Sequence, residues 1–247
     1  MPKFTDMEEK KIGGSNFKFS HVDIGSLGAT EYTLVGVVID KSGSVASYEG
    51  PLNLMVKEIV KACRRSPRAD NLQLRVVTFN SNVTEFHGFK PLPTCNENDY
   101  DGCVRPGGQT ALFDASYNMA KALAQYGADL QAQDFSVNAA MFVLTDGEDN
   151  DSKTTAAMVK DAIDAAKAKE SLESIMPVLI GVGTGSDASG LNQYLQGFKD
   201  EAGFQQYVAL DKADEKSLAK LGGFISRSIS SQSQALGTGG PSQNVTF

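Results

Sequence analysis

Two kinds of block alternate along the chain, one continuously apolar and one apolar only at helical spacing. The continuous runs are rich in β-branched residues, which is typical of strands covered on both faces. They lie at 32–39, 72–79, 139–145 and 174–183. The segments with helical spacing lie at 52–63, 111–126, 155–169 and 215–229. Strands that alternate with helices of this length predict a doubly wound α/β fold, with a mostly parallel sheet and helices on both of its faces.

One further predicted strand departs from this order. Residues 82–90 follow the run 72–79 after only two residues, and so short a connection joins antiparallel neighbours. We therefore expect one antiparallel strand at an edge of a Rossmann-like, mostly parallel sheet. Pro177 lies in the run 174–183 and has no N–H group for an interior ladder, so we place it at the entry of that strand.

Composition divides the chain into three parts. Residues 1–31 are mixed in character, and Phe17 and Phe19 alternate with polar neighbours. This part predicts an extension that adds to the main domain and contains one weak strand. Residues 32–230 carry the alternating pattern and predict a single domain. Residues 231–247 are uncharged and rich in Ser, Gln and Gly, the composition of a flexible tail outside the core.

Charge and hydropathy exclude several classes of partner. The 247 residues have a formal net charge of -7, and no block of basic residues is longer than a pair such as Arg64-Arg65. Nucleic acid is therefore not expected as a partner, because affinity for phosphate backbones is built from clustered cations. No run approaches the roughly 18 apolar residues of a membrane span, and the first residues are charged where a signal peptide is apolar. We expect a cytoplasmic protein that does not bind membranes.

The cysteines indicate neither a zinc site nor a disulfide framework. Cys63, Cys95 and Cys103 are an odd set, no C-x-x-C spacing occurs, and the chain has only two histidines. Cys95 and Cys103 share one loop and could pair in an exported protein. In a cytoplasmic protein we expect three free thiols.

Three loops carry unusual polar stretches. DKSGS (40–44) and TDGEDNDS (145–152) lie at the ends of two predicted strands, and RPGGQTALFDAS (105–116) leads into a predicted helix. In an open parallel sheet, ligands bind outside the carboxyl ends of the strands. We therefore expect the three loops to meet at one edge of the sheet.

Together these loops offer an all-oxygen set of side chains: Asp40, Ser42, Ser44, Thr110 and Asp146. Oxygen ligands select hard cations, and so small a set suits Mg²⁺, with Mn²⁺ or Ca²⁺ as alternatives. In extended backbone, residues two apart project to one side, so Asp40, Ser42 and Ser44 can converge. The two serines alone would equally suit the N-cap of the following helix. The addition of Thr110 and Asp146 favours the metal site.

These motifs, in this order, resemble the metal-ion-dependent adhesion site of a von Willebrand factor type A domain. The resemblance covers about residues 32–230. It rests on D-x-S-x-S at 40–44, a threonine followed by ALFDA at 110–115 and LTDGEDN at 144–150, and VTFNSNV at 77–83 is similar to a stretch of the bacterial members.

The resemblance assigns roles to the five residues. It implies that Ser42, Ser44 and Thr110 ligate the metal directly. Asp40 and Asp146 then act mostly through bound water and by accepting hydrogen bonds from the hydroxyls. Neutral ligands leave positive charge on the cation and a position open to the carboxylate of a partner protein.

The resemblance also implies a protein–protein interaction module rather than an enzyme. Stand-alone prokaryotic and viral domains of this family often work beside AAA+ ATPases of the MoxR kind or in stress-response and tellurite-resistance clusters, so we expect an intracellular adaptor. A structural component of a larger assembly, for instance a viral one, is the alternative. A metal-dependent phosphohydrolase is a third hypothesis, but with Asp40 as nucleophile it would usually need a second aspartate where Ser42 stands.

Other candidate residues have structural interpretations. Asp114 falls one turn into a predicted helix, where we expect hydrogen bonds within that first turn. Glu148, Asp149 and Asp151 could form a second, calcium site, but they precede a helix start and we favour a capping role. His87 is expected on the surface of the predicted edge strand rather than in a catalytic site.

Overall fold

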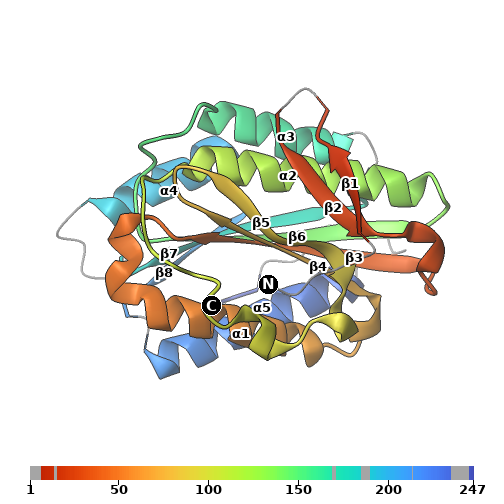
Figure 1. Cartoon of the computed structure of the whole chain (residues 1–247), viewed down its shortest axis with the longest axis horizontal. Helices are drawn as coiled ribbons and strands as arrows, with labels where there is room; N and C mark the ends of the chain where they lie inside the picture. The colour runs from red at the N-terminus through yellow and green to blue at the C-terminus, as the bar shows by residue number, and fades with distance from the viewer. Residues whose placement is uncertain (1–6, 14–15, 169–170, 185–189, 213, 235–244) are drawn as a thin grey trace.

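Eight strands form one sheet in the described part of the chain, in the order β1-β2-β5-β4-β3-β6-β7-β8 (Figure 1). This computed structural model describes residues 7–13, 16–168, 171–184, 190–212, 214–234 and 245–247. The strands are β1 (Met7–Lys11), β2 (Lys18–Val22), β3 (Glu31–Asp40), β4 (Leu72–Phe79), β5 (Val83–Pro91), β6 (Ser136–Thr145), β7 (Ile175–Val182) and β8 (Gln206–Leu210). The pairs β1-β2 and β4-β5 are antiparallel and the other neighbours are parallel. The prediction of a mostly parallel sheet is confirmed.

Helices cover both faces of this sheet, as Figure 1 shows. They are α1 (Glu49–Arg64), α2 (Leu112–Gln131), α3 (Ala156–Ala168), α4 (Leu191–Ala202) and α5 (Glu215–Gln234). Helices α1 and α5 pack on one face, and α2, α3 and α4 pack on the other. The doubly wound fold is therefore confirmed. Within the described residues, no helix combines the length and the apolar character needed to cross a bilayer.

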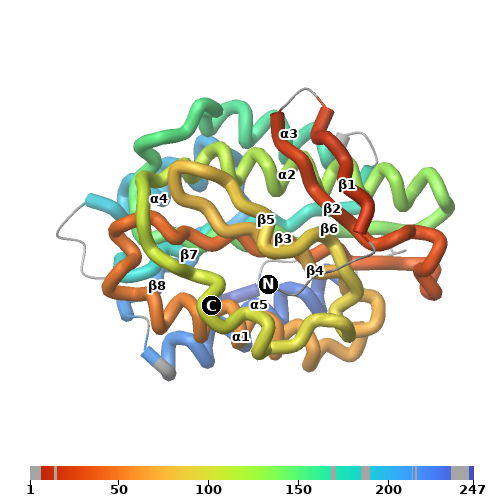
Figure 2. The backbone as a smooth tube through the Cα atoms, in the orientation of Figure 1, coloured from red at the N-terminus to blue at the C-terminus, as the bar shows by residue number. Residues whose placement is uncertain are grey.

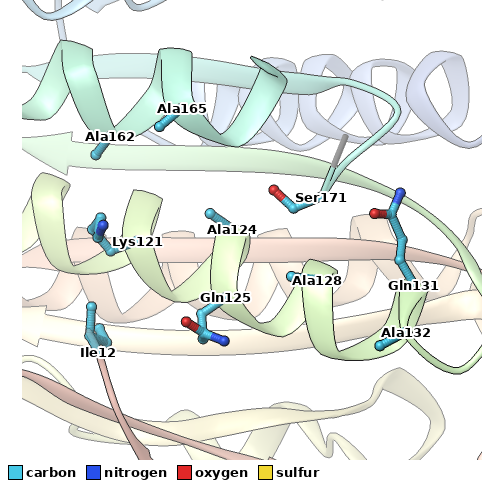
Figure 3. Close-up of a pocket in the computed structure, with 10 residues that line it drawn as sticks. All are labelled: Ile12, Lys121, Ala124, Gln125, Ala128, Gln131, Ala132, Ala162, Ala165 and Ser171. Carbon is cyan, nitrogen blue, oxygen red and sulfur yellow. The ribbon is translucent and has the colours of Figure 1, made fainter. Parts of the chain in front are cut away.

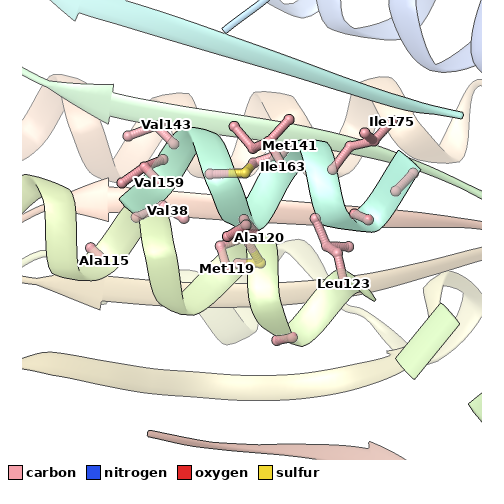
Figure 4. Close-up of a cluster of buried hydrophobic side chains, with 14 of the residues drawn as sticks. Val38, Ala115, Met119, Ala120, Leu123, Met141, Val143, Val159, Ile163 and Ile175 are labelled. Carbon is pink, nitrogen blue, oxygen red and sulfur yellow. The ribbon is translucent and has the colours of Figure 1, made fainter. Parts of the chain in front are cut away.

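Alternate residues of the central strand β3 face the two helical layers. Val38 belongs to the core beneath α2, α3 and α4, whereas Val37 and Ile39 belong to the core beneath α1 and α5. Figure 4 shows the first of these cores, in which Met119 of α2 and Ile163 of α3 lie against the sheet. Because both faces are buried, the strands have continuous apolar runs in the sequence.

Helix α2 packs closely against β3 at Gly36. A Cβ added at this position would lie 2.4 Å from Met119 Sδ, which is far inside van der Waals contact. Only a residue without a side chain allows the helix to lie here. The start of α2, next to Thr110, is thereby set against the central strand.

Helix α4 and strand β8 were not predicted. The apolar residues Leu191, Leu195, Phe198 and Ala202 have helical spacing, and the helix ends at Gly203, whose φ of 73° is the left-handed conformation typical of a C-cap. This pattern was available in the sequence and would have predicted the helix.

The N-terminal hairpin of β1 and β2 extends the sheet beyond β5 (Figure 2). Strand β2 pairs with β5 at His21 and Phe89, so β5 has a neighbour on each side and β1 is the outermost strand there. Phe19 is fully buried, in agreement with the weak strand signal. The close approach requires Gly88, because a Cβ there would lie 2.0 Å from the carbonyl oxygen of Ser20.

The expectation that His87 lies on the surface is wrong. Its side chain is 4% exposed, because the chain after β5 returns over it and brings Tyr100 Oη within 2.7 Å of His87 Nε2. His87 Nδ1 lies 2.8 Å from the carbonyl oxygen of Gly88, which can only accept. Burial lowers the pKa of His87 to about 3, so the imidazole is neutral at physiological pH.

Helix α5 includes the first residues of the predicted tail. Gln232 and Ser233 are buried. Ser233 Oγ lies 2.9 Å from Thr33 Oγ1, and the side chain of Asn138 donates to the carbonyl oxygen of Gln232. These polar partners in β3 and β6 explain why a polar segment packs in the core. Residues 235–244 lie outside the described residues, so the division into extension, domain and tail stays a prediction.

Pro177 lies near the entry of β7, where it was expected. It pairs with Met141 of β6, and its carbonyl oxygen accepts a 2.9 Å hydrogen bond from the backbone N–H of Gln205. Strand β8 pairs with β7 only from Val178 onward. The proline therefore precedes the part of β7 that has a strand on each side.

Candidate metal centre

The end of β3 places a buried carboxylate beside two hydroxyl groups. Asp40 is the last residue of β3 and is fully buried, and its Oδ1 accepts a 2.7 Å hydrogen bond from the backbone N–H of Ser42. Ser42 Oγ lies 3.0 Å from Ser44 Oγ. The alternate positions of the motif come together because the chain is still extended at Ser42 and turns only from Gly43.

The end of β6 adds the second carboxylate. Strand β6 is paired with β3, so Thr145 and Asp146 emerge beside Asp40. Ser44 Oγ donates a 2.7 Å hydrogen bond to Asp146 Oδ1. Thr145 Oγ1 donates a 2.6 Å hydrogen bond to Asp40 Oδ2. Asp40, both serines and Asp146 therefore form one hydrogen-bonded group across the two central strands.

Backbone hydrogen bonds fasten the loop before α2 to this group. The N–H of Gly107 donates to the carbonyl oxygen of Lys41, and the N–H of Gly43 donates to that of Gly108, each at 2.9 Å. The side-chain amide of Asn80 donates a 2.6 Å hydrogen bond to Gly107. Gly108 has a φ of 85°, a conformation that glycine adopts without strain. The third loop is thereby held against DKSGS, as the sequence predicted.

Thr110 borders the same space from this third loop. Its backbone N–H donates a 2.8 Å hydrogen bond to Asn150 Oδ1. A Cβ added to Gly147 would lie 3.6 Å from Ser44 Oγ and 3.7 Å from Thr110 Oγ1. The hydroxyls of Ser44 and Thr110 therefore line one small space, which the glycine leaves open.

Both carboxylates are less acidic than usual in the metal-free protein. Burial raises the pKa of Asp40, and hydrogen bonds from Thr145 and Ser42 oppose this shift. Burial raises the pKa of Asp146 to about 6, the Ser44 hydroxyl lowers it, and the charge of Asp40 raises it further. A bound cation would act in the opposite direction, because positive charge favours the ionised carboxylates.

The donor set fits a hard divalent cation. It consists of hydroxyl and carboxylate oxygens, the ligands of Mg²⁺, Mn²⁺ and Ca²⁺. Within the described residues, no group of three or more His, Cys, Asp or Glu side chains is placed to hold a metal. The centre therefore differs from a zinc site or a cage of carboxylates, and suits a cation that keeps several waters.

Two nearby carboxylates accept hydrogen bonds at helix starts, but neither does so at the helix start that was expected for it. Asp149 was expected to cap the helix after it, yet its Oδ1 accepts a 3.2 Å hydrogen bond from the N–H of Phe113 in α2. Asp114 was expected to bond within its own helix, yet it accepts from the N–H groups of Lys153 at 3.2 Å and Thr154 at 2.8 Å, just before α3. The first turn of α2 thus accepts from donors just before α3, and the loop before α3 accepts from a donor in α2.

Three residues that position the centre were not predicted from the sequence. Thr145 binds Asp40, Asn80 holds the loop at Gly107, and Asn150 holds Thr110. The only available signals were a hydroxyl at a strand end and asparagines in two loops. Such residues are common in ordinary turns, so they do not identify these roles.

A groove of about 520 Å³ lies between α2 and α3 (Figure 3). None of its lining residues belongs to the oxygen cluster, which is the group Asp40, Ser42, Ser44, Thr110 and Asp146. On α2 it is lined from Lys121 onward, by two alanines, Ala124 and Ala128, and two glutamines, Gln125 and Gln131. Thr110 precedes the start of the same helix. The groove therefore belongs to the opposite half of α2 and does not contribute to the candidate metal centre.

One protein family matches most of the chain. The model of the von Willebrand factor type A domain matches residues 35–221. No curated protein sequence matches the chain.

Solved structures share the fold at low sequence identity. The PilB minor pilin from Streptococcus sanguinis has a TM-score of 0.54 at 17% identity, over 82% of this chain and 62% of the pilin. Proximal thread matrix protein 1 from the mussel byssus, with a zinc-occupied MIDAS motif, has a TM-score of 0.51 at 20% identity, over 81% of this chain and 46% of that protein. BatB from Bacteroides thetaiotaomicron has a TM-score of 0.50 at 15% identity, over 79% of this chain and 98% of that protein. The chain thus spans less than two thirds of the pilin and of the thread matrix protein.

Proposed function

Because the chain belongs to the von Willebrand factor type A domain family, whose members are generally protein-interaction modules, we propose that it binds a partner protein through a divalent cation. Ser42, Ser44 and Thr110 would ligate the cation, and Asp40 and Asp146 would act through water and through the hydroxyls. When bound, the cation offers a coordination position to an incoming oxygen ligand. That ligand, in this proposal, is a carboxylate of the partner.

One observation carries the proposal. Ser44 Oγ contacts both Ser42 Oγ and Asp146 Oδ1, and Thr110 Oγ1 borders the same open space. Ser44 lies at the exposed edge of this group, while Asp40 is fully buried behind it. The neutral hydroxyls of Ser44 and Thr110 thus border the open space, and ligation by neutral groups would leave positive charge on the cation for a partner's carboxylate.

Mg²⁺ is the proposed cation, with Mn²⁺ and Ca²⁺ as alternatives. The thread matrix protein carries zinc in its motif, so zinc belongs in the same comparison. Calorimetric titration of the metal-free protein with each of the four chlorides measures the preference. Absence of Mg²⁺ binding would contradict the choice of Mg²⁺, whereas tighter binding of zinc than of Mn²⁺ would only follow the general order of affinities among first-row metals.

The geometry supports binding rather than hydrolysis. Asp40 would be the nucleophile of a phosphohydrolase, but it is fully buried and both of its oxygens accept hydrogen bonds. A nucleophile has to reach the atom that it attacks. Mg²⁺-dependent hydrolysis of p-nitrophenyl phosphate that is abolished by Asp40→Ala would contradict this part of the proposal.

At a finer level, we propose a cytoplasmic adaptor that works beside an AAA+ ATPase of the MoxR kind or within a stress-response cluster. The three cysteines are buried and free, which suits a reducing compartment. A structural component of a larger assembly is the alternative. Deletion of residues 235–247 leaves α5 whole and distinguishes the two, since an adaptor should still bind its ATPase whereas a component that docks by its tail should fail to assemble.

Capture of partners from the native cell tests the central proposal. Capture in Mg²⁺ should be lost in EDTA and in the double variant Ser42→Ala, Ser44→Ala, while circular dichroism of the variant stays unchanged. Ser47→Ala is the matched control, because Ser47 is an exposed serine of the same 3₁₀ turn (Gly43–Tyr48). Partners that remain bound under both treatments would show that the metal is not the contact.

A further inference from the structure

A polar cavity of about 280 Å³ lies under the N-terminal hairpin, apart from the candidate metal centre. Its polar lining includes Glu9 of β1, Lys18 of β2, Arg75 of β4, Glu85 of β5 and Asn118 of α2. None of its lining residues belongs to the three loops of the oxygen cluster. The proposed function makes no use of this cavity.

Arg75 lines the cavity and is fully buried, and one of its three guanidinium nitrogens is left without a partner among the described residues. Its Nε donates a 2.7 Å hydrogen bond to Glu85 Oε2, and its Nη1 donates a 3.0 Å hydrogen bond to Asn118 Oδ1. Among the described residues, Nη2 has no hydrogen-bond partner. A guanidinium group is planar and rigid, so the bonds at Nε and Nη1 also fix the direction of Nη2.

Glu85 is fixed in place and does not supply the missing acceptor. Its Oε1 accepts hydrogen bonds from Ser20 Oγ at 2.5 Å and from the N–H of Ser20 at 3.0 Å, while Oε2 accepts from Arg75. The carboxylate therefore links β2 to β4. It compensates the charge of Arg75, while Nη2 is left without an acceptor among the described residues.

Asn118 also lines the cavity. Its side chain is almost fully buried. Because a guanidinium group only donates, the atom of Asn118 that faces Arg75 has to be Oδ1. The amide Nδ2 of Asn118 is thereby turned away from Arg75.

We propose that this cavity binds a carboxylate group, which Arg75 Nη2 and the Asn118 amide hold at the inner wall and Lys18 attracts at the mouth. Arginine recognises carboxylates because its N–H groups match their two oxygens. Within the described part of the chain, Glu9 is the one ionic partner of Lys18, at 2.7 Å, and the side chains of Lys18 and Glu9 are 50% and 63% exposed. So exposed a pair is weak, and Lys18 can therefore exchange Glu9 for a ligand.

Sodium acetate is the probe, titrated into the metal-free protein and followed by ¹H–¹⁵N NMR. We expect saturable shifts of the Asn118 side-chain amide, the Arg75 Nε–H and the Ser20 N–H. Sodium chloride at equal ionic strength and acetamide, the neutral analogue, should give none. Acetate shifts that do not saturate, or that sodium chloride reproduces, overturn the proposal and leave water as the occupant of the cavity.

Two charge-neutralising variants test whether the acetate binds in this cavity, because their expected effects are opposite. Lys18→Gln should weaken acetate binding and Glu9→Gln should strengthen it, each by about two- to fivefold, as for other exposed charges. Lys10→Gln is the matched control, because Lys10 lies on the same hairpin but pairs with Asp129 of α2. Saturable binding that neither Lys18→Gln nor Glu9→Gln changes would place the acetate elsewhere and also overturn the proposal.

A carboxylate could come from a small organic acid or from an acidic side chain of a partner. Propionate and N-acetyl-aspartate N-methylamide distinguish these sources, because only the second carries a peptide backbone. Tighter binding of the blocked aspartate than of propionate assigns the site to a protein partner, and the reverse assigns it to a small acid. The double variant Ser42→Ala, Ser44→Ala should leave acetate binding unchanged, so the two proposals can fail separately.

Discussion

Two polar clusters of the sheet differ in how their charges are compensated. The oxygen cluster lies at the ends of β3 and β6. The arginine cluster, formed by Arg75, Glu85 and Asn118, lies under the N-terminal hairpin. Arg75 has a carboxylate of the chain at 2.7 Å. Asp40 and Asp146 have hydroxyl and N–H partners, and the pKa of each is raised by burial. The arginine is balanced within the folded chain, whereas the two aspartates are not.

This difference separates a contribution to stability from a contribution to binding. Removal of one member of a buried ion pair leaves the other charge uncompensated and is destabilising. Removal of a carboxylate that already lacks a counter-charge relieves a burial cost and should be tolerated by the fold. The two clusters should therefore respond in opposite ways to neutral substitutions.

The largest expected effect comes from Arg75→Met. This variant leaves Glu85 without its cation, so the free energy of unfolding should fall by about 3 kcal/mol, measured by urea denaturation. The double variant Arg75→Met, Glu85→Gln should recover part of the loss, because it removes the uncompensated charge as well.

Arg68→Met is the matched control for this prediction. Arg68 also pairs with a glutamate, Glu31, but the two side chains are 38% and 31% exposed. An exposed pair contributes at most about 1 kcal/mol. Equal losses in the Arg68 and Arg75 variants would refute the special role of the buried arginine.

The next largest effect concerns the metal. With free Mg²⁺ at a hundred times its dissociation constant, the free energy of unfolding of the native protein should rise by about 2.7 kcal/mol. Asp40→Asn should abolish this increase, because the ionised carboxylate that supports the cation is gone. Without metal, the same variant should unfold within about 0.5 kcal/mol of the native protein, since its buried charge has no cation to balance it. A large loss of stability in metal-free Asp40→Asn would show that the oxygen cluster also stabilises the fold.

The smallest effect concerns pH. Burial raises the pKa of Asp146 from 3.8 to about 6, so between these values the folded state binds a proton that the unfolded state does not, and stability rises as the pH falls. His87 acts in the opposite sense, because its pKa falls from 6.5 to about 3 and the unfolded state binds the proton first. Asp146→Asn removes the contribution of Asp146, which stabilises the fold as the pH falls, and leaves the opposite contribution of His87. Its free energy of unfolding should therefore fall more steeply than that of the native protein, by about 1 kcal/mol over this range after allowance for partial exposure.

Urea denaturation of both proteins in metal-free buffer, at several pH values from 6 down to 4, measures this difference. Near pH 6, Mg²⁺ should reduce this difference between the native protein and the variant, because the bound cation favours ionised Asp146. Parallel pH profiles of the native protein and the variant would contradict the raised pKa of Asp146.

The sequence predicted the layers of the fold and the meeting of the three loops, because both follow from the order of apolar runs. It did not predict which backbone donors the nearby carboxylates reach. Asp114 was expected to bond within its own helix and Asp149 to cap the helix that follows it, whereas each binds donors at the other helix start. Such exchanges depend on how two loops lie in space, which the local pattern does not contain.

Buried polar groups were the second source of error. Gln232 and Ser233 were assigned to a tail because of their composition, yet polar residues of the sheet hold them in the core. Arg75 is the one charged residue in the run LQLRVVTF, and it signalled a buried partner that the sequence could not identify. In both cases, the partner is distant in sequence and only the fold brings it near.

The close contact at Gly36 has a consequence for the rate of partner binding. Met119 leaves α2 no room to approach β3 more closely, and the helix start adjoins Thr110. In the proposed metal site, the helix start beside Thr110 would therefore already be in place before a partner arrives. The association rate constant of the metal-loaded protein should then be that of ordinary rigid docking. Differences in affinity among partners should appear in their dissociation rate constants.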